Sequence, residues 1–504
     1  MQNMGFVRIK PYFTAVQEKY KITGKDFAMN LKKAALINAA GKYSQVIIQL
    51  GVSAILSRIL TPDDYGIVAV VTVFSTFFAT LSNMGFGTAI IQKKDLTDED
   101  VNNIYSFTVY VSIVLTAMFS VLSFGIAWFY KDSIYIPIML LLGISLFFNS
   151  MNMVPNGILN RDKKFKTIAI RTVAVYAGAA VVAVILALLH FRYYALIIQN
   201  ILAAFLNFIW NYVSTKPKFR SKVDMASIKK VSNYSGYQFA FNFINYFAGN
   251  LDNLLTGKFF GSTDLGYYNK AYTLSLYPVN NLKSVVSPVL HPILSDYQNE
   301  KDVLYSKYIK VLKLMLLLGT YAEAVCYIAG GELITIIFGS QWERSIFCFK
   351  MLSLCIVFRM MNSSSGAILQ SLGNTKLLFI NGLVNTCIST AAILTGIFVF
   401  GDINHLSLCV AVAYVLHYVS TSLMVISLGF DYTQKRYFMD MYRDYIVLAV
   451  TMAAAFLDFF SIENIFVSAV CKGLYITVVF GAVMFVTKEY KIFTMLLPKK
   501  KKTA

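Results

Sequence analysis

Five charged residues stand inside stretches of sequence that are otherwise long and apolar. Lys42, Lys283 and Arg359 are the cations, and Asp252 and Glu323 are the acids. A charge in such a setting is costly unless it lines a polar cavity or has a partner. Lysine and arginine are the natural holders of phosphate. The excess of cations therefore favours binding of an anion, and Lys42, Lys283 and Arg359 are the candidate residues.

A structural role for each charge is the alternative. A buried charge can be retained only because it pairs with another, and Glu323 is as well suited to pairing two helices as to lining a cavity. Asp252 could pair with Lys258, although a spacing of six residues places Lys258 off the helical face of Asp252. Lys472 and Asp458 lie outside the repeated part of the chain, and we interpret them as packing or interface residues.

Amide side chains accompany these charges at helical spacing. One stripe comprises Asn38, Lys42, Gln45 and Gln49, and the corresponding stripe comprises Gln238, Asn242, Asn245, Gly249 and Asp252. Each set falls on one face of a helix. Amides and tyrosines suit sugar hydroxyls, and the tyrosines available are Tyr234, Tyr237, Tyr246 and Tyr277. The stripes predict that Gln45, Gln49, Asn242 and Asn245 bind substrate in a central cleft.

The two stripes belong to a repeat with an offset of 200 residues. SRILTPDDYGIV (57–68) aligns without a gap to GKFFGSTDLGYY (257–268), so that Gly66 meets Gly266. A second echo relates GILNRDKKFK (157–166) to GAILQSLGNTK (366–376). Because six apolar blocks separate the copies, the halves are expected to be parallel repeats about an axis along the membrane normal. The acids Asp63 and Asp64 follow Pro62, and a helix N-cap is a better interpretation of them than a metal-binding dyad.

The elements that carry these residues are apolar blocks of membrane-spanning length. Of 504 residues, 57% are hydrophobic and 14% are charged, against about 25% charged in soluble proteins. We predict an all-α integral membrane protein of about fourteen spans. They lie near 34–57, 66–91, 104–130, 134–158, 167–189, 193–213, 232–257, 267–296, 308–330, 346–369, 376–400, 404–428, 443–460 and 465–487. The seventh and eighth are polar enough to escape a hydropathy criterion.

Basic residues follow the topology. The net charge is +19, and lysines and arginines concentrate in both tails and in the loops after the fourth and sixth spans. This pattern predicts that the even-numbered loops and both termini are cytoplasmic, and it favours contact with anionic lipid rather than nucleic acid. Residues 1–33 do not resemble a cleavable signal peptide, so the first span is expected to be an anchor.

The motifs of several enzyme classes are absent from the sequence. It has no GxxxxGK[ST] loop, no HExxH motif and no CxxC pair, so we expect no built-in ATPase, zinc site or disulfide framework. We therefore predict no catalytic residue, no metal and no cofactor.

The expected organisation is two six-helix lobes with basic connections. The predicted segments are a basic cytoplasmic segment 1–33, an N-lobe 34–214, a basic linker 215–231, a C-lobe 232–428, two extra helices 429–487, and a basic tail 488–504. Such a chain is expected to work as an alternating-access transporter for a polar, anionic cargo.

Four motifs in order resemble a known family. LSRILTPDDYGIVAVVTVF, GFGTAIIQKKDLTDED, ILNRDKKFK and NLDNLLTGKFFGSTDLGYYNKAYTLSLYPV are similar to the polysaccharide transporter family of Wzx-type oligosaccharide flippases, in the multidrug/oligosaccharidyl-lipid/polysaccharide flippase superfamily. The likeness covers residues 34 to 430. It implies a V-shaped pair of helix bundles in the bacterial inner membrane. It also implies a cargo of undecaprenyl-diphosphate-linked oligosaccharide, moved to the outer leaflet for O-antigen, capsule or exopolysaccharide synthesis, with other polysaccharide assembly proteins as partners.

In the resulting hypothesis the three cations hold the diphosphate, the amide stripes hold the glycan, and the lobes rock about the cleft. A coupling proton or Na⁺ would be taken up by Asp252 or Glu323. Two other classes stay open. A cation-coupled drug or metabolite exporter would need a mainly anionic cleft, and a membrane glycosyltransferase or polymerase would need a large odd-numbered loop, whereas the longest here, near 331–345, is short.

Overall fold

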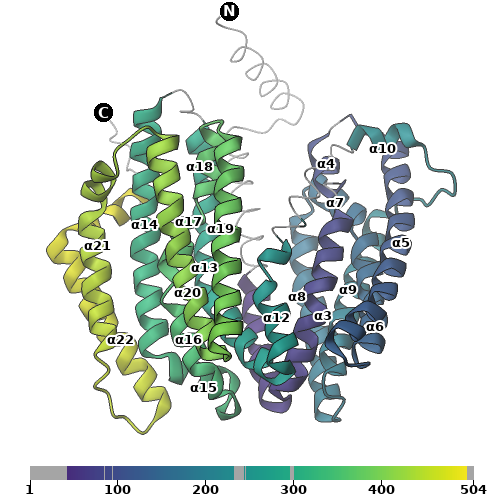
Figure 1. Ribbon diagram of the computed structural model, residues 1–504. Coiled ribbons are helices and arrows are strands. Elements are labelled where there is room, and N and C mark those ends of the chain that lie inside the picture. The colour runs from purple at the N-terminus through teal and green to yellow at the C-terminus, as the bar shows by residue number, and fades with distance from the viewer. Residues whose placement is uncertain are drawn as a thin grey trace, which may run out of the picture. The chain divides into compact units, whose positions relative to one another are not determined.

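The protein is described from a computed structural model, in which helices are the only regular structure of the described residues (Figure 1). The structure describes residues 43–83, 86–93, 95–231, 243, 246–295 and 300–496. The predicted all-α class is confirmed.

The described residues of the first half form a helical stretch over 43–59 and eight bounded helices. These are α3 (Pro62–Asn83), α4 (Phe86–Gln92), α5 (Asp98–Tyr130), α6 (Tyr135–Met151), α7 (Met153–Arg161), α8 (Phe165–Leu188), α9 (Tyr194–Thr215) and α10 (Met225–Val231).

The second half continues with α12 (Leu251–Phe259), α13 (Gly261–Ser295), α14 (Lys301–Ile328), α15 (Gly330–Phe338), α16 (Arg344–Ser353), α17 (Ile356–Asn362), α18 (Ser365–Ser371), α19 (Thr375–Thr395), α20 (Ile403–Leu423), α21 (Gln434–Phe456) and α22 (Ile465–Thr487). The π-helical turns Gly396–Phe400 and Met424–Gly429 extend α19 and α20. Two 3-10 segments lie at Ser340–Trp342 and Glu489–Leu496.

Nine helices within the described residues are long and apolar enough to cross a membrane, or ten if the pair 344–353 and 356–371, bent by 46°, is one span. The expected fifth, ninth and fourteenth spans correspond to α8, α14 and α22. As expected, the polar α13 is absent from the nine although it has 35 residues. The total of fourteen stays a prediction. The region 331–345, predicted as a loop, instead contains α15 and a 3-10 turn, because apolar Ile334, Phe338 and Trp342 are buried there.

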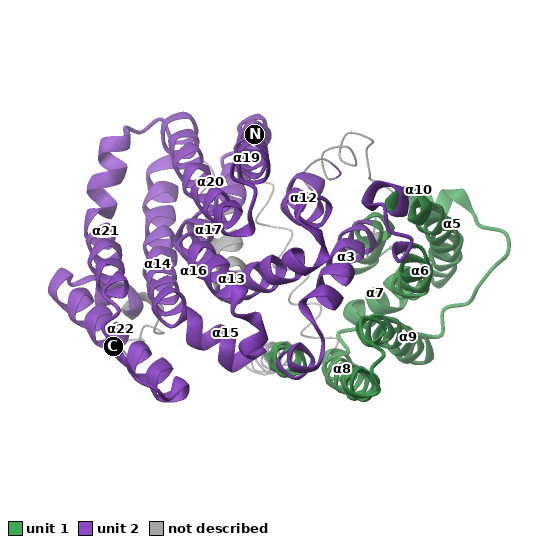
Figure 2. Cartoon of the chain, turned by 60° about the horizontal axis from the view of Figure 1, so that its bottom comes forward, with its two compact units in different colours: residues 1–53, 78–126, 136–234 green, residues 54–77, 127–135, 235–504 purple. Residues whose placement is uncertain are grey.

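The contacts divide the chain into two compact units (Figure 2). Unit 1 comprises residues 1–53, 78–126 and 136–234, and unit 2 comprises 54–77, 127–135 and 235–504. In unit 1, α8 packs on α9 and α4 packs on α7. In unit 2, α14 lies along α21 and α17, and α19 lies along α20. The division into the predicted lobes and tails stays a prediction.

The helix start predicted at Asp63 and Asp64 is confirmed, but the capping residue is Thr61, and both acids lie in the first turn of α3. Thr61 precedes α3, and its backbone N and Oγ1 donate to Asp64 Oδ2 at 3.0 and 2.8 Å. The backbone N of Asp64 donates back to Thr61 Oγ1 at 3.3 Å. Thr97 and Asp100 repeat this reciprocal arrangement at the start of α5. Such a capping box satisfies backbone donors that a helix start leaves unpaired.

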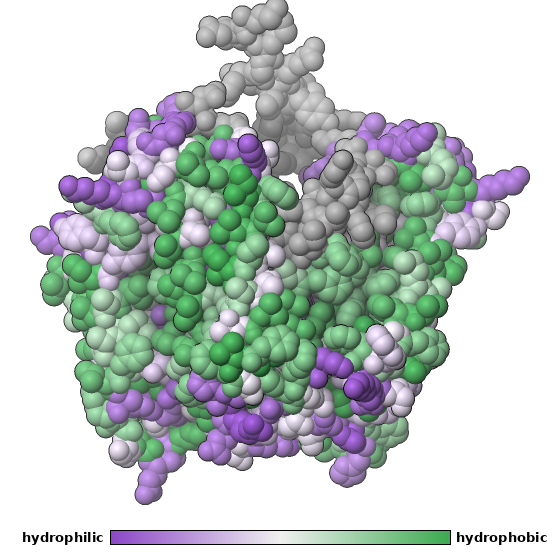
Figure 3. Space-filling model, in the orientation of Figure 1, coloured by the Kyte–Doolittle hydropathy of each residue, from purple (hydrophilic) through white to green (hydrophobic). Residues whose placement is uncertain are grey.

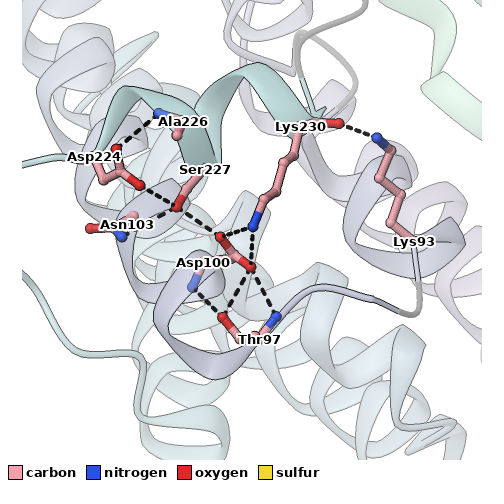
Figure 4. A network of polar contacts seen from close by, with 8 residues as sticks. All are labelled: Lys93, Thr97, Asp100, Asn103, Asp224, Ala226, Ser227 and Lys230. Atoms are coloured by element: carbon pink, nitrogen blue, oxygen red, sulfur yellow. Dashed lines mark hydrogen bonds and ion pairs between the residues drawn. The ribbon is translucent and has the colours of Figure 1, made fainter.

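Two predicted even-numbered loops meet in unit 1 (Figure 4). Asp100 Oδ1 accepts from Ser227 Oγ and from Lys230 Nζ, both at 2.8 Å. Lys93 Nζ donates to the carbonyl oxygen of Lys230, and the hydrogen bond to Asp100 raises the pKa of Lys230. Helices of alternating direction place even-numbered loops on one side, so this contact agrees with the predicted order of spans.

Candidate functional site

Arg359 is a buried cation of unit 2. It lies in α17 with 9% of its surface exposed. Its Nη2 donates to the hydroxyls of Tyr272 at 3.1 Å and Tyr414 at 3.2 Å, and its guanidinium carbon lies 4.1 Å from the centre of the Tyr414 ring. Its Nη1 has no hydrogen-bond partner, and no carboxylate forms an ion pair with it, among the residues that the structure describes. Arg359 is thus a cation without a direct ion pair among the described residues, and its Nη1 is a buried donor without a partner.

Asp252 lies in α12 near Arg359 and is connected to it through tyrosines. Its Oδ2 accepts from the Tyr268 hydroxyl at 2.7 Å, and its Oδ1 accepts from the backbone N of Asn253 at 2.8 Å. The Tyr268 ring stacks on that of Tyr272 with 5.9 Å between centres. Tyr272 in turn is a partner of Arg359, so α12, α13, α17 and α20 position one polar layer.

A small cavity adjoins this layer. It measures about 20 Å³ and is lined by Ala248, Gly249, Asp252, Tyr272, Ser389, Ile393, Val410, Ala413 and Tyr414. A space of this size holds about one water molecule. It suits a water or a small cation beside a carboxylate, whereas a sugar ring does not fit.

The alternative pairing of Asp252 with Lys258 does not form. Lys258 Nζ donates instead to the carbonyl oxygen of Phe129 and lies 4.9 Å from the centre of that residue's ring. Their separation follows from helical spacing, since six residues place two side chains on different faces.

Glu323 connects two helices. It is buried in α14, and its Oε2 accepts from the backbone N of Val357 in α17 at 2.9 Å. Val357 is at the start of α17, where backbone donors lack helical partners. This contact fits the helix-pairing alternative for Glu323.

Lys270 is a buried cation that the sequence analysis missed. It lies in α13 with 6% of its surface exposed, and its Nζ donates to Ser57 Oγ at 2.7 Å. The same nitrogen lies 3.6 Å from the centre of the Tyr65 ring and 5.4 Å from that of Trp342. A lysine among aromatic rings is stabilised by cation–π attraction. In the sequence, Lys270 could have been noticed because it lies one helical turn after Gly266. Its counterpart in the repeat, Val70, is apolar, so the repeat did not indicate a polar site there.

The other predicted binding residues divide into two groups. Lys42, Asn242 and Asn245 lie outside the described residues, and Lys283 belongs to α13 with its side chain outside the description. Gln45 and Gln49 lie in the helical stretch 43–59 of unit 1, half-buried and exposed respectively. Among the predicted site residues, the structure therefore brings together Arg359 and Asp252, both in unit 2.

The structure also shows the contacts of one predicted tyrosine and of the two predicted packing residues. Tyr246 uses its hydroxyl within unit 2, donating to the carbonyl oxygen of Val73 at 2.6 Å. Lys472 forms ion pairs with Asp458 at 2.6 Å and Glu332 at 2.7 Å. This contact joins α22 to α15 and confirms the packing interpretation of Lys472 and Asp458.

The helices and the buried polar layer define a multi-pass helical membrane protein. The chain belongs to the family described as polysaccharide biosynthesis protein, whose sequence profile matches residues 55–347. This match confirms the family resemblance, and its start coincides with the first copy of the repeated turn.

Named relatives are similar over most of their length. The teichuronic acid biosynthesis protein TuaB of Bacillus subtilis (strain 168) is 23% identical over 337 residues, covering 66% of this chain and 69% of the relative. The lipopolysaccharide biosynthesis protein WzxC of Escherichia coli (strain K12) is 22% identical over 380 residues, covering 73% of this chain and 76% of the relative.

Solved structures share the fold. The lipid II flippase MurJ in an inward closed conformation superposes with a TM-score of 0.67 at 16% identity, covering 90% of this chain and 99% of MurJ. An inward-facing multidrug resistance MATE family transporter of the MOP superfamily gives a TM-score of 0.58 at 12% identity, covering 80% of this chain and 95% of that structure. The chain thus shares its fold with these two transporters.

Proposed function

We propose that this protein is a flippase for lipid-linked oligosaccharides in polysaccharide biosynthesis. Its cargo is an undecaprenyl-diphosphate-linked glycan, moved from the cytoplasmic to the outer leaflet of the bacterial inner membrane by alternating access, with both termini cytoplasmic. Family membership and the fold shared with a lipid II flippase support this proposal. Other polysaccharide assembly proteins are its expected partners.

The observation that carries the proposal is the buried Arg359 cation, which forms no direct ion pair with any described carboxylate. A buried cation normally has an acid partner, but Arg359 has two tyrosine hydroxyls and a free Nη1 within the described part of the chain. Arginine binds phosphate through parallel hydrogen bonds. Arg359 would hold the diphosphate together with Lys42 and Lys283, while Gln45, Gln49, Asn242 and Asn245 would bind the glycan.

The test is binding of undecaprenyl-diphosphate oligosaccharide to protein in nanodiscs. Arg359→Gln should raise Kd about tenfold or more, because a hydrogen bond to a charged group contributes about 1.5–3 kcal/mol. The Kd of Arg359→Lys should lie between those of the wild type and Arg359→Gln, since lysine keeps the charge and loses the paired geometry. The matched control is Arg161→Gln, at a more exposed arginine outside unit 2. Equal affinity of wild type and Arg359→Gln would overturn this role of Arg359.

A cation-coupled exporter is the second candidate, favoured by the cavity beside Asp252. A carboxylate at a cavity of about 20 Å³ suits a proton or Na⁺ rather than a large anion. We infer that Asp252 takes up a coupling ion, which is compatible with either cargo. Glu323 is the weaker coupling candidate because its carboxylate already accepts from the backbone of α17.

A further inference from the structure

Unit 2 contains another, larger cavity, which we name the basic pocket. It measures about 520 Å³ and lies where α14 and α21 begin and α22 ends. Its lining residues are Tyr305, Ser306, Ile309, Lys310, Lys313, Arg436, Asp440, Arg443, Lys488, Glu489, Lys491 and Ile492. The volume is in the range of small-ligand sites.

Positive charge dominates this lining. Six of these residues are lysines or arginines, and two are carboxylates. Both carboxylates are engaged: Asp440 accepts from the Tyr305 hydroxyl at 2.9 Å, and Glu489 lies 3.9 Å from Lys313 Nζ. Lys313 also forms an ion pair at 3.0 Å with Asp444, which is fully buried. Glu489 and Asp444 therefore compensate Lys313, and the other cations of the lining outnumber the one remaining carboxylate, Asp440.

Three cations of the lining are available to a ligand. Lys310, Arg443 and Lys488 are exposed and form no ion pair with any described residue. Lys488 ends α22 in a left-handed conformation, with φ of 63°. Lys310 of α14, Arg443 of α21 and Lys488 directly after α22 line one space. Lysine and arginine side chains in such an arrangement are typical of phosphate recognition.

The surface beside the basic pocket is apolar. Phe438, Tyr442 and Ile446 of α21 are exposed at the spacing of one helical face, and Phe485 and Val486 of α22 are 72% and 77% exposed. Figure 3 shows hydrophilic residues gathered at the upper left, with apolar residues covering the surface below them. A charged pocket bordered by exposed apolar helices matches a lipid, whose headgroup is anionic and whose chains are apolar.

The predicted topology agrees with this assignment. The starts of α14 and α21 and the end of α22 all lie at even-numbered connections or at the C-terminal tail, on the side predicted to be cytoplasmic. Anionic lipids attract basic segments at the cytoplasmic leaflet. Arg443 Nε donates to the Tyr442 hydroxyl at 2.8 Å. Its two terminal nitrogens and the ammonium groups of Lys310 and Lys488 would add short-range contacts to that long-range attraction.

We propose that the basic pocket binds the phosphate group of an anionic membrane lipid, with Lys310, Arg443 and Lys488 as its ligands. The bound headgroup connects α14, α21 and α22. This site is independent of the cargo site at Arg359, and the proposal does not depend on the nature of the cargo. A soluble phosphate is the other source of the same chemistry, and the experiment separates the two.

The experiment measures lipid binding to the full chain in detergent by native mass spectrometry. The probes are dioctanoyl phosphatidylglycerol, dioctanoyl phosphatidylcholine and inorganic phosphate. The test variant is Lys310→Gln/Arg443→Gln/Lys488→Gln. The matched control, Lys163→Gln/Lys166→Gln/Lys229→Gln, removes the same charge from exposed lysines of unit 1. Thermal unfolding without lipid verifies that both variants fold.

The wild type and the control variant should bind phosphatidylglycerol with the same Kd. The Kd of the test variant should be at least tenfold higher. Arg359→Gln should leave this binding unchanged, so that failure of this proposal is distinguishable from failure of the flippase proposal. Equally weakened lipid binding in the control variant, or unchanged lipid binding in the test variant, would overturn the basic pocket as the binding site. Equal binding of phosphatidylcholine would overturn recognition of a net anion. If inorganic phosphate displaced phosphatidylglycerol with an equal affinity, the ligand would be a soluble phosphate rather than a lipid.

Discussion

Gly66 and Gly266 make the same close contact in reciprocal directions. A β-carbon on Gly66 would lie 1.7 Å from the carbonyl oxygen of Ser262, and one on Gly266 would lie 1.9 Å from that of Pro62. Each glycine thus lies against the first turn of the other's helix, and both pairs are offset by 200 residues. The repeated turn is therefore a pseudo-symmetric contact between the starts of α3 and α13, to which the hydrogen bond from Ser262 to Asp63 adds.

Either glycine should be intolerant of a methyl group. Gly66→Ala and Gly266→Ala force a backbone to move, so each should lower stability by about 1–3 kcal/mol. Thermal unfolding in detergent measures the change. Gly178→Ala is the matched control, since a β-carbon at Gly178 in α8 would meet nothing within 4 Å, and alanine in a helix is neutral or stabilising. Equal unfolding temperatures for all three variants would refute the contact.

The ion pairs of Lys472 should stabilise the attachment of α22. Lys472→Met leaves Glu332 and Asp458 without their cation and should cost about 1–3 kcal/mol, less than in a fully buried pair because the Asp458 side chain is 32% exposed. Adding Glu332→Gln and Asp458→Asn removes the unpaired charges and should recover much of that loss. Lys301→Met, which breaks an exposed pair with Asp431, should cost less than about 1 kcal/mol. Similar losses for Lys472→Met and Lys301→Met would contradict a buried role.

Stability should fall in acid through Glu332. Burial acts to raise the pKa of this carboxyl, but the hydrogen bonds from Lys472 and Ser468 outweigh burial and lower it below the ordinary value of 4.5. A lowered folded-state pKa gives a contribution that is fully present above about pH 4.5 and is lost as the pH falls below it. The difference in unfolding temperature between wild type and Glu332→Gln should therefore shrink from pH 6 to pH 3. A constant difference would show that this carboxyl does not titrate in that window.

The response of transport to a pH or Na⁺ gradient should require Asp252. If this carboxylate takes up the coupling ion, Asp252→Asn should abolish the effect of pH or Na⁺ gradients on transport in proteoliposomes, while cargo binding persists. Glu323→Gln should keep that effect, because an amide oxygen still accepts from the backbone of Val357. A gradient response preserved in Asp252→Asn would exclude Asp252 as the coupling site.

The sequence by itself determined the elements and the family. Apolar blocks of span length predicted an all-helical membrane protein, because lipid offers backbone groups no other partner. Pro62 followed by Asp63 and Asp64 predicted one helix start, since capping is local chemistry. The repeat at 57–68 and 257–268 placed the two glycines in register.

Only the tertiary structure decided which polar residues meet. Arg359 and Asp252 stand more than a hundred positions apart, and tyrosines on α13 and α20 join them. Lys270 looked like one lysine among many until its ring partners from distant segments were known. Tertiary packing likewise decided three other features. It separates Lys258 from Asp252, it forms the helix at 330–338, and it brings together Lys310, Arg443 and Lys488. Periodicity fixes the face on which a side chain lies, but the partner of that face depends on how separate helices pack.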